Sequence, residues 1–305
     1  MKTKIALPAM LLPACFCGAI WTQTSGMAFA QNAQTSGAAK LNNSQNYQTQ
    51  EFDVTVGAGA SGDRKITTRV ISPPAEKLAK KPLLLLSFAM DRNTSLGVEP
   101  YNLTAKYFLE HGHRVASFDL PNHGSRVNQY GEAITGMRNA FVAAQDPFSR
   151  FVEEGKAVTD RCIANGLAEP GRIAVCGTSR AGYLALRLLA ADKRIAAAAV
   201  YAPVTDWRAL TEFAADQKRA DVAALNLSNF ADALAGKPLY MVMGNHDARV
   251  STESCCRFYL DLAAANARHN FDNAHLNFQV QDTPGHSSQV SWSVAGAEFL
   301  LKPLQ

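Results

Sequence analysis

A serine near the middle of the chain is placed where it could act as a nucleophile. The apolar run 173–176 leads directly into Gly177-Thr178-Ser179-Arg180-Ala181-Gly182, and an apolar helical pattern follows. A serine at a sharp turn between a strand and a helix is presented to substrate, and small neighbouring residues let the strand and the helix approach each other. Gly177 and Ala181 meet this need, although Ala181 stands where a glycine is usual. We therefore interpret Ser179 as a candidate nucleophile; the alternative is a serine that only caps the helix.

A serine hydroxyl becomes a good nucleophile only beside a base that is itself held in place by an acid. Asp247 follows the apolar run 239–243, and His286 follows the last strand pattern of the chain. Because the carboxyl ends of parallel strands meet at one edge of a sheet, we expect both side chains to lie near Ser179. The order serine, aspartate, histidine along the chain is also that of hydrolases with such a turn. Asp206, which follows another strand pattern, is the alternative acid.

Two further groups next to these residues have possible roles. The helix behind Ser179 directs its N-terminal dipole and the amide of Arg180 to the place where an oxyanion would form. The guanidinium of Arg180 either binds an anionic or hydroxylated part of the substrate or forms a salt bridge on the helix flank. His123 and His246 lie in loops that follow strand patterns, and we interpret both as turn residues.

Strand and helix patterns that could position these residues alternate along the chain. Alternating apolar residues predict a hairpin at 52–56 and 66–71. Strand patterns then recur at 83–88, 115–118, 173–176, 195–200, 239–243 and 276–280. Helical patterns lie between or after them at 100–109, 147–162, 181–192, 252–267 and 288–301. This alternation predicts an α/β fold, with a mostly parallel central sheet and helices on both faces.

Two segments do not fit the alternation. Residues 121–145 are predicted to form a long loop, and residues 203–236 form an insertion with weak helical patterning. Insertions after parallel strands often build pockets and lids, so we interpret 203–236 as a possible short lid. Trp207 in this insertion either lines the substrate site or packs the insertion against the core.

The first fifty residues differ from the rest of the chain. Two lysines precede an apolar run at 5–20, and Ala28-Phe29-Ala30 is a pattern that signal peptidase accepts, so residues 1–30 are predicted to be a signal peptide. The mature protein would then be periplasmic or secreted. The alternatives are a membrane anchor or a lipoprotein anchored at Cys15. Residues 31–50 are polar and small and are predicted to be a disordered linker before a single domain at 51–305.

Composition excludes several classes of protein. Of the 305 residues, 47% are hydrophobic, and 30 basic residues against 26 acidic ones give a net charge of only +4, which argues against a nucleic-acid partner. No apolar run after the N-terminal segment predicts a membrane span. The cysteines after that segment are expected to be buried thiols, and Cys162 with Cys176 is the pair for a disulfide if one forms. No spacing of cysteines and histidines indicates a metal site.

The chain resembles the α/β-hydrolase superfamily over residues 50–303. The motifs that carry the resemblance are Gly177-Thr178-Ser179-Arg180-Ala181-Gly182, Gly244-Asn245-His246-Asp247-Ala248-Arg249-Val250, Gly285-His286 and Phe118-Asp119-Leu120-Pro121-Asn122-His123-Gly124. Within the superfamily, the chain is most similar to dienelactone-hydrolase and prolyl-oligopeptidase-like serine hydrolases. The resemblance implies an α/β-hydrolase fold with Ser179, His286 and Asp247 as the catalytic triad.

The resemblance also implies a reaction and a second oxyanion donor. Such enzymes often carry a His-Gly pair after the third strand, whereas this chain has Phe88-Ala89-Met90, so the amide of Met90 is expected to join that of Arg180. The expected activity is hydrolysis of a small-molecule carboxylic ester through an acyl-enzyme, with no metal or organic cofactor. The alternatives are a serine peptidase or amidase of the same fold, and a catalytically silent binding protein.

Overall fold

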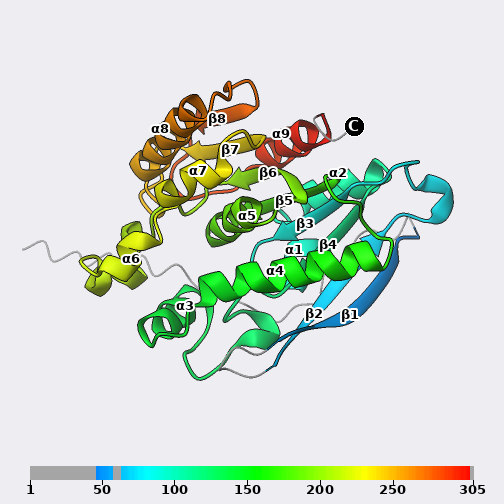
Figure 1. Ribbon diagram of the computed structural model, residues 1–305, viewed down its shortest axis with the longest axis horizontal. Helices are drawn as coiled ribbons and strands as arrows, with labels where there is room; N and C mark the ends of the chain where they lie inside the picture. The colour runs from blue at the N-terminus through cyan, green and yellow to red at the C-terminus, as the bar shows by residue number, and fades with distance from the viewer. Residues whose placement is uncertain (1–45, 58–62, 303–305) are drawn as a thin grey trace, which may run out of the picture. The chain divides into compact units, whose positions relative to one another are not determined.

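The structure is a computed structural model that describes residues 46–57 and 63–302. The described residues contain an eight-stranded sheet in the order β1-β2-β4-β3-β5-β6-β7-β8 (Figure 1). Its strands are β1 (Gln48–Val56), β2 (Arg64–Ser72), β3 (Leu84–Phe88), β4 (Arg114–Phe118), β5 (Ile173–Thr178), β6 (Ile195–Tyr201), β7 (Leu239–Gly244) and β8 (Leu276–Gln281). The pairs β1 with β2 and β2 with β4 are antiparallel, and all the following pairs are parallel.

The central strands are buried and mostly apolar. Every residue of β3 is buried, and so is every residue of β7. A strand that is covered on both faces needs such a continuous apolar run, and an alternating pattern would place polar groups against a helix. The strands predicted from these runs are therefore confirmed, with ends that differ by one or two residues. The predicted N-terminal hairpin is confirmed as β1 and β2.

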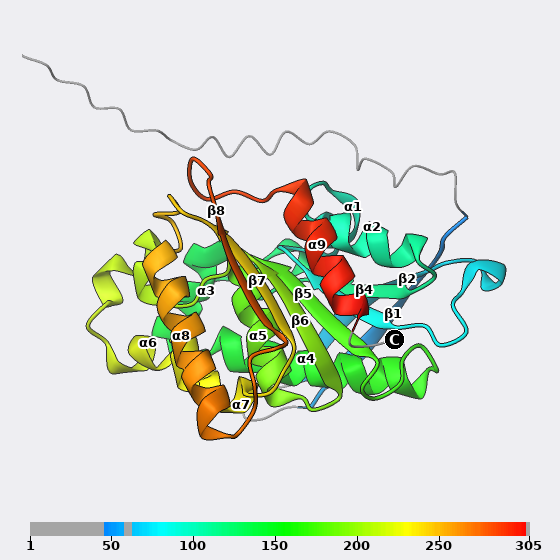
Figure 2. The ribbon, with the colours of Figure 1, turned by 90° about the horizontal axis from the view of Figure 1, so that it is seen from above.

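Helices cover both faces of the sheet. The helices are α1 (Arg92–Gly97), α2 (Leu103–Glu110), α3 (Ala133–Val142), α4 (Pro147–Ala164), α5 (Arg180–Ala191), α6 (Ala220–Ala224), α7 (Ala231–Leu234), α8 (Thr252–Arg268) and α9 (Val290–Leu301). Helices α2 and α9 pack together on one face, while α4 packs beside α5 on the other (Figure 2). The layers and the strand order are those of the α/β-hydrolase fold, which confirms the predicted fold class.

Helix α4 shows how the sequence specifies these elements. The side chain of Asp146 accepts hydrogen bonds from the amides of Phe148 and Ser149, and a proline occupies the first turn. These groups begin the helix because the first amides of a helix have no partner within it. Phe151 and other apolar residues of its inner face are fully buried, as the helical spacing predicted.

Two predictions for the segments between these elements were wrong. Residues 121–145 are not one long loop, because α3 lies within them and buries Ile134, Met137 and Phe141 at helical spacing. Residues 48–50 are not linker, since they pair with β2 as part of β1. The predicted signal peptide, its alternatives and most of the predicted linker lie outside the described residues, as do residues 58–62 between β1 and β2.

The insertion at 203–236 folds as short helical turns. It contains η3 (Trp207–Ala209), η4 (Thr211–Asp216) and η5 (Leu227–Phe230), besides α6 and α7. Trp207 and Phe213 are fully buried in it. The amide of Leu227 also donates to the carbonyl of Thr205, which ties the end of the insertion to its beginning. The segment is thus packed against the domain through its own apolar side chains.

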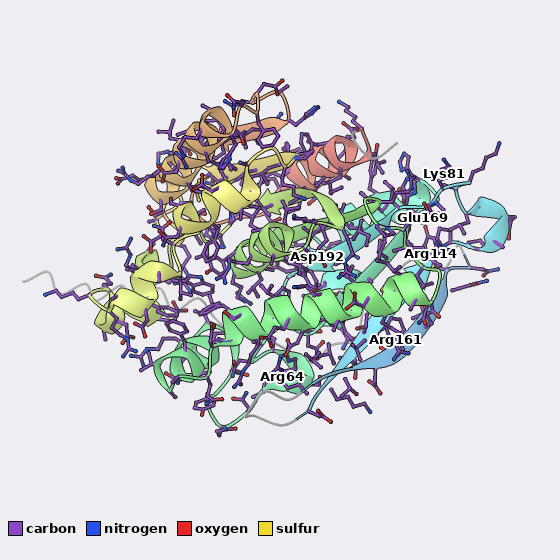
Figure 3. All side chains as sticks on the ribbon, in the orientation of Figure 1. Arg64, Lys81, Arg114, Arg161, Glu169 and Asp192 are labelled. Carbon is purple, nitrogen blue, oxygen red and sulfur yellow. The ribbon has the colours of Figure 1, made fainter. Side chains whose placement is uncertain are left out.

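The amino ends of the parallel strands lie at the edge of the sheet opposite to their carboxyl ends. Lys81, Arg114 and Glu169, which precede or begin β3, β4 and β5, lie at the amino end (Figure 3). Within the described residues, no helix is long and apolar enough to cross a bilayer. No group of three or more potential metal-binding side chains occurs there either. Cys162, Cys176, Cys255 and Cys256 are free thiols, so Cys162 and Cys176 do not form the disulfide considered for them.

Candidate active site

Ser179 lies in a strained turn between β5 and α5. Its backbone has φ 58° and ψ −122°, a conformation that residues with a side chain rarely adopt. The end of β6 and the residues after it hold this turn: the amide of Ser179 donates to the carbonyl of Tyr201 at 2.9 Å, and its carbonyl accepts from the amide of Val204 at 3.0 Å. Backbone hydrogen bonds therefore hold the strained conformation in place.

The turn needs small residues because neighbouring atoms lie too close for larger side chains. A Cβ atom on Gly177 would lie 2.4 Å from the carbonyl oxygen of Ala181, and one on Gly182 would lie 2.9 Å from Cβ of Pro203. Ala181 itself is fully buried and accommodated. The alanine that departs from the usual motif thus fits the turn, while the glycines at 177 and 182 allow the close approach of strand, helix and the chain after β6.

The structure brings Ser179, His286 and Asp247 together. Nε2 of His286 lies 3.1 Å from Oγ of Ser179, and Nδ1 of the same ring lies 2.7 Å from Oδ2 of Asp247. The three residues come from the carboxyl ends of β5, β7 and β8, as the parallel sheet predicted. In this arrangement the imidazole can accept a proton from the serine hydroxyl while the carboxylate fixes its tautomer.

The groups around Asp247 stabilise the ionised form of its carboxyl group. Its side chain is buried, and Oδ1 accepts hydrogen bonds from the amides of Arg249 and Val250 at 3.0 and 3.1 Å. Burial alone would raise the pKa of Asp247, but the hydrogen bond and charge of His286 together with these two amides lower the pKa below its usual value. The carboxylate can thus hold the imidazole without taking its proton.

The loops that carry Asp247 and His286 are joined side by side. Asn245, which follows β7, accepts a hydrogen bond from the amide of Thr283 and donates one to Asp282. Gly244 makes this contact possible, because a Cβ atom there would lie 1.8 Å from Oγ1 of Thr283. The distance between the acid and the base is therefore fixed by a second set of contacts.

Two backbone amides are available beside Ser179. Arg180 is the first residue of α5, so its amide has no partner within the helix. After β3, the amide of Ala89 donates to Oγ of Ser95 at 2.9 Å, whereas the amide of Met90 donates to no acceptor in the described residues. Ala89, Met90, Ser179, Arg180 and His286 line one cavity of about 170 Å³. The predicted donors Arg180 and Met90 are thus at the same cavity as the serine.

Trp207 is not among the described residues that line the cavity of Ser179, which favours the second of its two predicted roles. It is fully buried, and its ring packs 4.7 Å from that of Phe148, 5.2 Å from that of Tyr183 and 5.4 Å from that of Phe213, measured between centroids. The alternative, in which Trp207 packs the insertion against the core, is the observed one. Among the described residues, those that line the cavity of Ser179 include none from 203–236, so this segment does not cover the cavity as a lid.

The competing acid and histidine lie apart from the serine. Asp206 caps η3 and pairs with Arg208 at 2.5 Å and with Asn226 at 3.0 Å. His246 has a largely exposed side chain and lies 3.6 Å from Asp282. In the described part of the chain, neither side chain forms a hydrogen bond or ion pair with His286 or Ser179. Asp247 is thus the acid that the structure places beside the histidine.

One contact at the site was missed by the sequence analysis. Nε of Arg180 donates to Nε2 of His123 at 2.8 Å, and Nδ1 of His123 lies 2.8 Å from the carbonyl of Pro121. The ring is buried, and its burial, followed by the charge of Arg180, lowers the pKa of His123 to about 4. His123 is therefore more than a turn residue, and the position of its loop after β4, at the same edge of the sheet, was the available signal.

Comparison with known proteins defines the class of protein. The profile of the prolyl oligopeptidase family matches residues 126–298, which include Ser179, Asp247 and His286. The chain belongs to this family. Membership of this family makes it a serine hydrolase. A search of curated proteins found no match.

Solved structures share the fold at low sequence identity. A cold-adapted esterase from an Arctic intertidal metagenomic library is 19% identical with a TM-score of 0.63, over 85% of this chain and 95% of that one. An acetyl xylan esterase from Paenibacillus sp. R4 is 16% identical with a TM-score of 0.59, over 85% and 89%. A putative dipeptidyl aminopeptidase IV from Bacteroides ovatus is 16% identical with a TM-score of 0.63, over 86% of this chain but only 36% of that one.

Proposed function

We propose that this serine hydrolase cleaves a small carboxylic ester through a triad of Ser179, His286 and Asp247. The observation that carries the proposal is the continuous pair of contacts from Oγ of Ser179 to the imidazole at 3.1 Å and from the imidazole to Asp247 at 2.7 Å. These contacts open onto a cavity of about 170 Å³. A cavity of about 150 Å³ holds a benzene molecule, so this one suits a short acyl or alcohol group.

The proposed reaction proceeds in two halves. Oγ of Ser179 attacks the acyl carbon while Nε2 of His286 takes the hydroxyl proton, and the oxyanion is stabilised by the amides of Arg180 and Met90. The imidazolium then gives that proton to the departing alkoxide, which leaves an acyl-enzyme. Water attacks the acyl-enzyme with His286 as the base, and the acid product and the free serine result. Ser179, His286 and the attacking water together supply every proton and electron pair in this sequence.

A fluorophosphonate probe tests the nucleophile. It should label the wild-type protein on the peptide that contains Ser179, and labelling should disappear in Ser179→Ala. Ser149→Ala is a matched control, because Ser149 is an exposed serine on α4 far along the chain from the triad. A folded wild-type protein that neither takes the label nor turns over short-chain nitrophenyl esters would support the silent binding protein instead.

Peptide hydrolysis is the second candidate, and the family match favours it. The comparison that separates the two is an ester and an anilide with the same acyl group. We expect the ester to have the higher kcat/KM by about a hundredfold or more, since the cavity offers little room for a peptide on both sides of the scissile bond. A higher kcat/KM for peptidyl anilides than for the matched esters would identify the protein as a peptidase.

We also propose that the protein acts outside the cytoplasm. We expect residues 1–30 to direct export, so that the mature protein starts at Gln31 and acts on its substrate in the periplasm or outside the cell. The N-terminus of the exported protein tests this expectation. If the exported protein keeps residues 1–30 or carries lipid on Cys15, it is anchored to the membrane, and the expected soluble exported form is wrong.

A further inference from the structure

The guanidinium of Arg180 has hydrogen-bonding capacity that its described neighbours do not use. Its Nε donates to His123, but neither Nη1 nor Nη2 donates to an acceptor within residues 46–57 and 63–302. A guanidinium carries five N–H donors, and four of them belong to the two Nη groups. Arg180 also lines the cavity of Ser179, so these donors are next to the reacting bond.

Among the described residues, no carboxylate forms an ion pair with Arg180. Burial lowers the pKa of Arg180, which is the expected effect of placing a cation where water is scarce. Glu212 is the acid whose charge acts on it, but Glu212 already forms a two-pronged pair with Arg249 at 2.8 and 2.5 Å. A partly buried arginine remains charged, and it is stabilised by an anion that brings its own negative charge.

The remainder of the cavity lining favours an anion over a cation. The lining residues within 46–57 and 63–302 include no acid, so an amino group of a substrate would meet no carboxylate among them. Tyr101, Ser287 and Ser288 add hydroxyl groups to the lining. Ser288 lines this cavity, and its Oγ is buried with no hydrogen-bond partner in the described structure. An unpaired buried hydroxyl is costly and is satisfied by a polar group of a ligand.

His123 holds the guanidinium in a single orientation. Its Nδ1 lies 2.8 Å from the carbonyl of Pro121, a partner that requires the proton on Nδ1 and leaves Nε2 as an acceptor. The lone pair on Nε2 then binds Nε–H of Arg180 at 2.8 Å. Because the guanidinium is planar, fixing Nε also fixes the plane in which the two Nη groups lie. His123 is in this sense a positioning residue, since it acts through Arg180.

We infer that the preferred substrates are esters that carry a carboxylate close to the scissile bond, and that the Nη groups of Arg180 bind this carboxylate. The inference rests on the proposed ester hydrolysis and adds the chemical class of the substrate. An arginine fork matches the two oxygens of a carboxylate and forms charge-assisted hydrogen bonds with it. Ser288 lines the same cavity and carries a hydroxyl that no described group uses.

Matched substrate pairs test the inference. Monoethyl succinate and ethyl 4-methylpentanoate differ by a carboxylate and an isopropyl group of similar shape on the acyl side. The pair 4-acetoxybenzoate and 4-isopropylphenyl acetate makes the same exchange on the alcohol side. Turnover is followed by acid release at constant pH. We expect the wild-type protein to prefer the charged member of one pair, and Arg180→Gln to lower that preference about tenfold or more, which corresponds to the loss of a hydrogen bond to a charged group.

The preference is a ratio of two kcat/KM values, so a variant that is partly unfolded does not alter it. Arg180→Lys keeps the charge without the fork and should retain part of the preference. His123→Gln offers another acceptor to Nε and should retain more of it than His123→Ala. Arg257→Gln is the charge control: it removes a cation whose side chain is 67% exposed on α8, and it should leave the ratio unchanged.

The outcomes separate this inference from the proposed function. Equal use of charged and neutral esters in both pairs, or a preference that survives Arg180→Gln, would overturn the inference while Ser179-dependent ester hydrolysis still stood. Failure of the folded protein to hydrolyse any of the four esters would overturn the proposed function and this inference with it.

Discussion

The imidazole of His286 is held by a carboxylate that lies 39 residues earlier in the chain: Nδ1 of His286 and Oδ2 of Asp247 are 2.7 Å apart. This contact joins the loops after β7 and β8, and the contact of Asn245 with Thr283 holds the same loops together independently. The base can therefore keep its place even when the charge of Asp247 is removed. This separation of geometry from charge makes Asp247 a suitable residue for substitution.

Asp247→Asn should abolish most of the activity without unfolding the protein. The amide keeps the shape of the carboxylate but does not hold the imidazole in the tautomer whose Nε2 accepts a proton, which lowers kcat by about a thousandfold to ten-thousandfold in triads of this kind. The measurement is kcat on a short-chain ester, together with the melting temperature. Asp206→Asn is the matched control, because Asp206 pairs with Arg208 away from the histidine. A greater loss of kcat in Asp206→Asn than in Asp247→Asn would assign the acid differently.

Gly177→Ala should disrupt the turn that carries Ser179. The added Cβ would lie 2.4 Å from the carbonyl oxygen of Ala181, so the strand and the helix must separate. Overpacking of this kind costs about 1 to 3 kcal/mol in the free energy of unfolding, and we expect ester turnover to fall as well. Gly97→Ala adds the same methyl group where nothing lies within 4 Å, and it should affect neither property. If Gly177→Ala behaved like Gly97→Ala, the turn would be less tightly packed than we describe.

Stability should fall as the pH decreases from about 6.5 to about 4. Burial, followed by neighbouring positive charges, lowers the pKa of His113 from 6.5 to about 4, and Nδ1 of its neutral ring accepts a hydrogen bond from the amide of Leu83. The unfolded chain takes up a proton on this residue near pH 6.5, whereas the folded protein does so only near pH 4. Between these values the unfolded state binds more protons, so the free energy of unfolding falls with falling pH.

His113→Asn should reduce this dependence on pH, because asparagine offers an acceptor without a titrating ring. Urea unfolding at several pH values between 4 and 7 measures the effect, and the slope of stability against pH should be smaller in the variant. His123 contributes in the same direction, since its pKa is also lowered to about 4, so part of the slope should remain. An identical slope in the two proteins would show that His113 is not kept neutral by folding.

Much of the fold could be predicted because its signals are local. The apolar run at 83–88 predicts a buried strand by itself, and Asp146 with the following proline marks the start of α4. The position of Ser179 followed from a strand, a small-residue turn and a helix in direct succession. Parallel strands then placed Asp247 and His286 at the same edge, which needed only the order of elements along the chain.

Other features could not be predicted, mainly because they depend on contacts between distant segments. The partners of Trp207 come from α4, α5 and the insertion, so its burial could not be separated from a role at the site. The contact of Arg180 with His123 spans 57 residues and has no local pattern. Helix α3 was missed for a different reason: its apolar residues have helical spacing, but the polar and glycine-containing segment around them resembled a loop.

The most direct test of the account is the hydrolysis of a short-chain nitrophenyl ester by Ser179→Ala. We expect kcat/KM to fall by about a thousandfold or more while the melting temperature stays close to that of the wild-type protein, because the hydroxyl makes its contact with His286 at the cavity and not in the core. Full activity in Ser179→Ala would contradict the account, since the reaction would then proceed without the hydroxyl on which every other role depends.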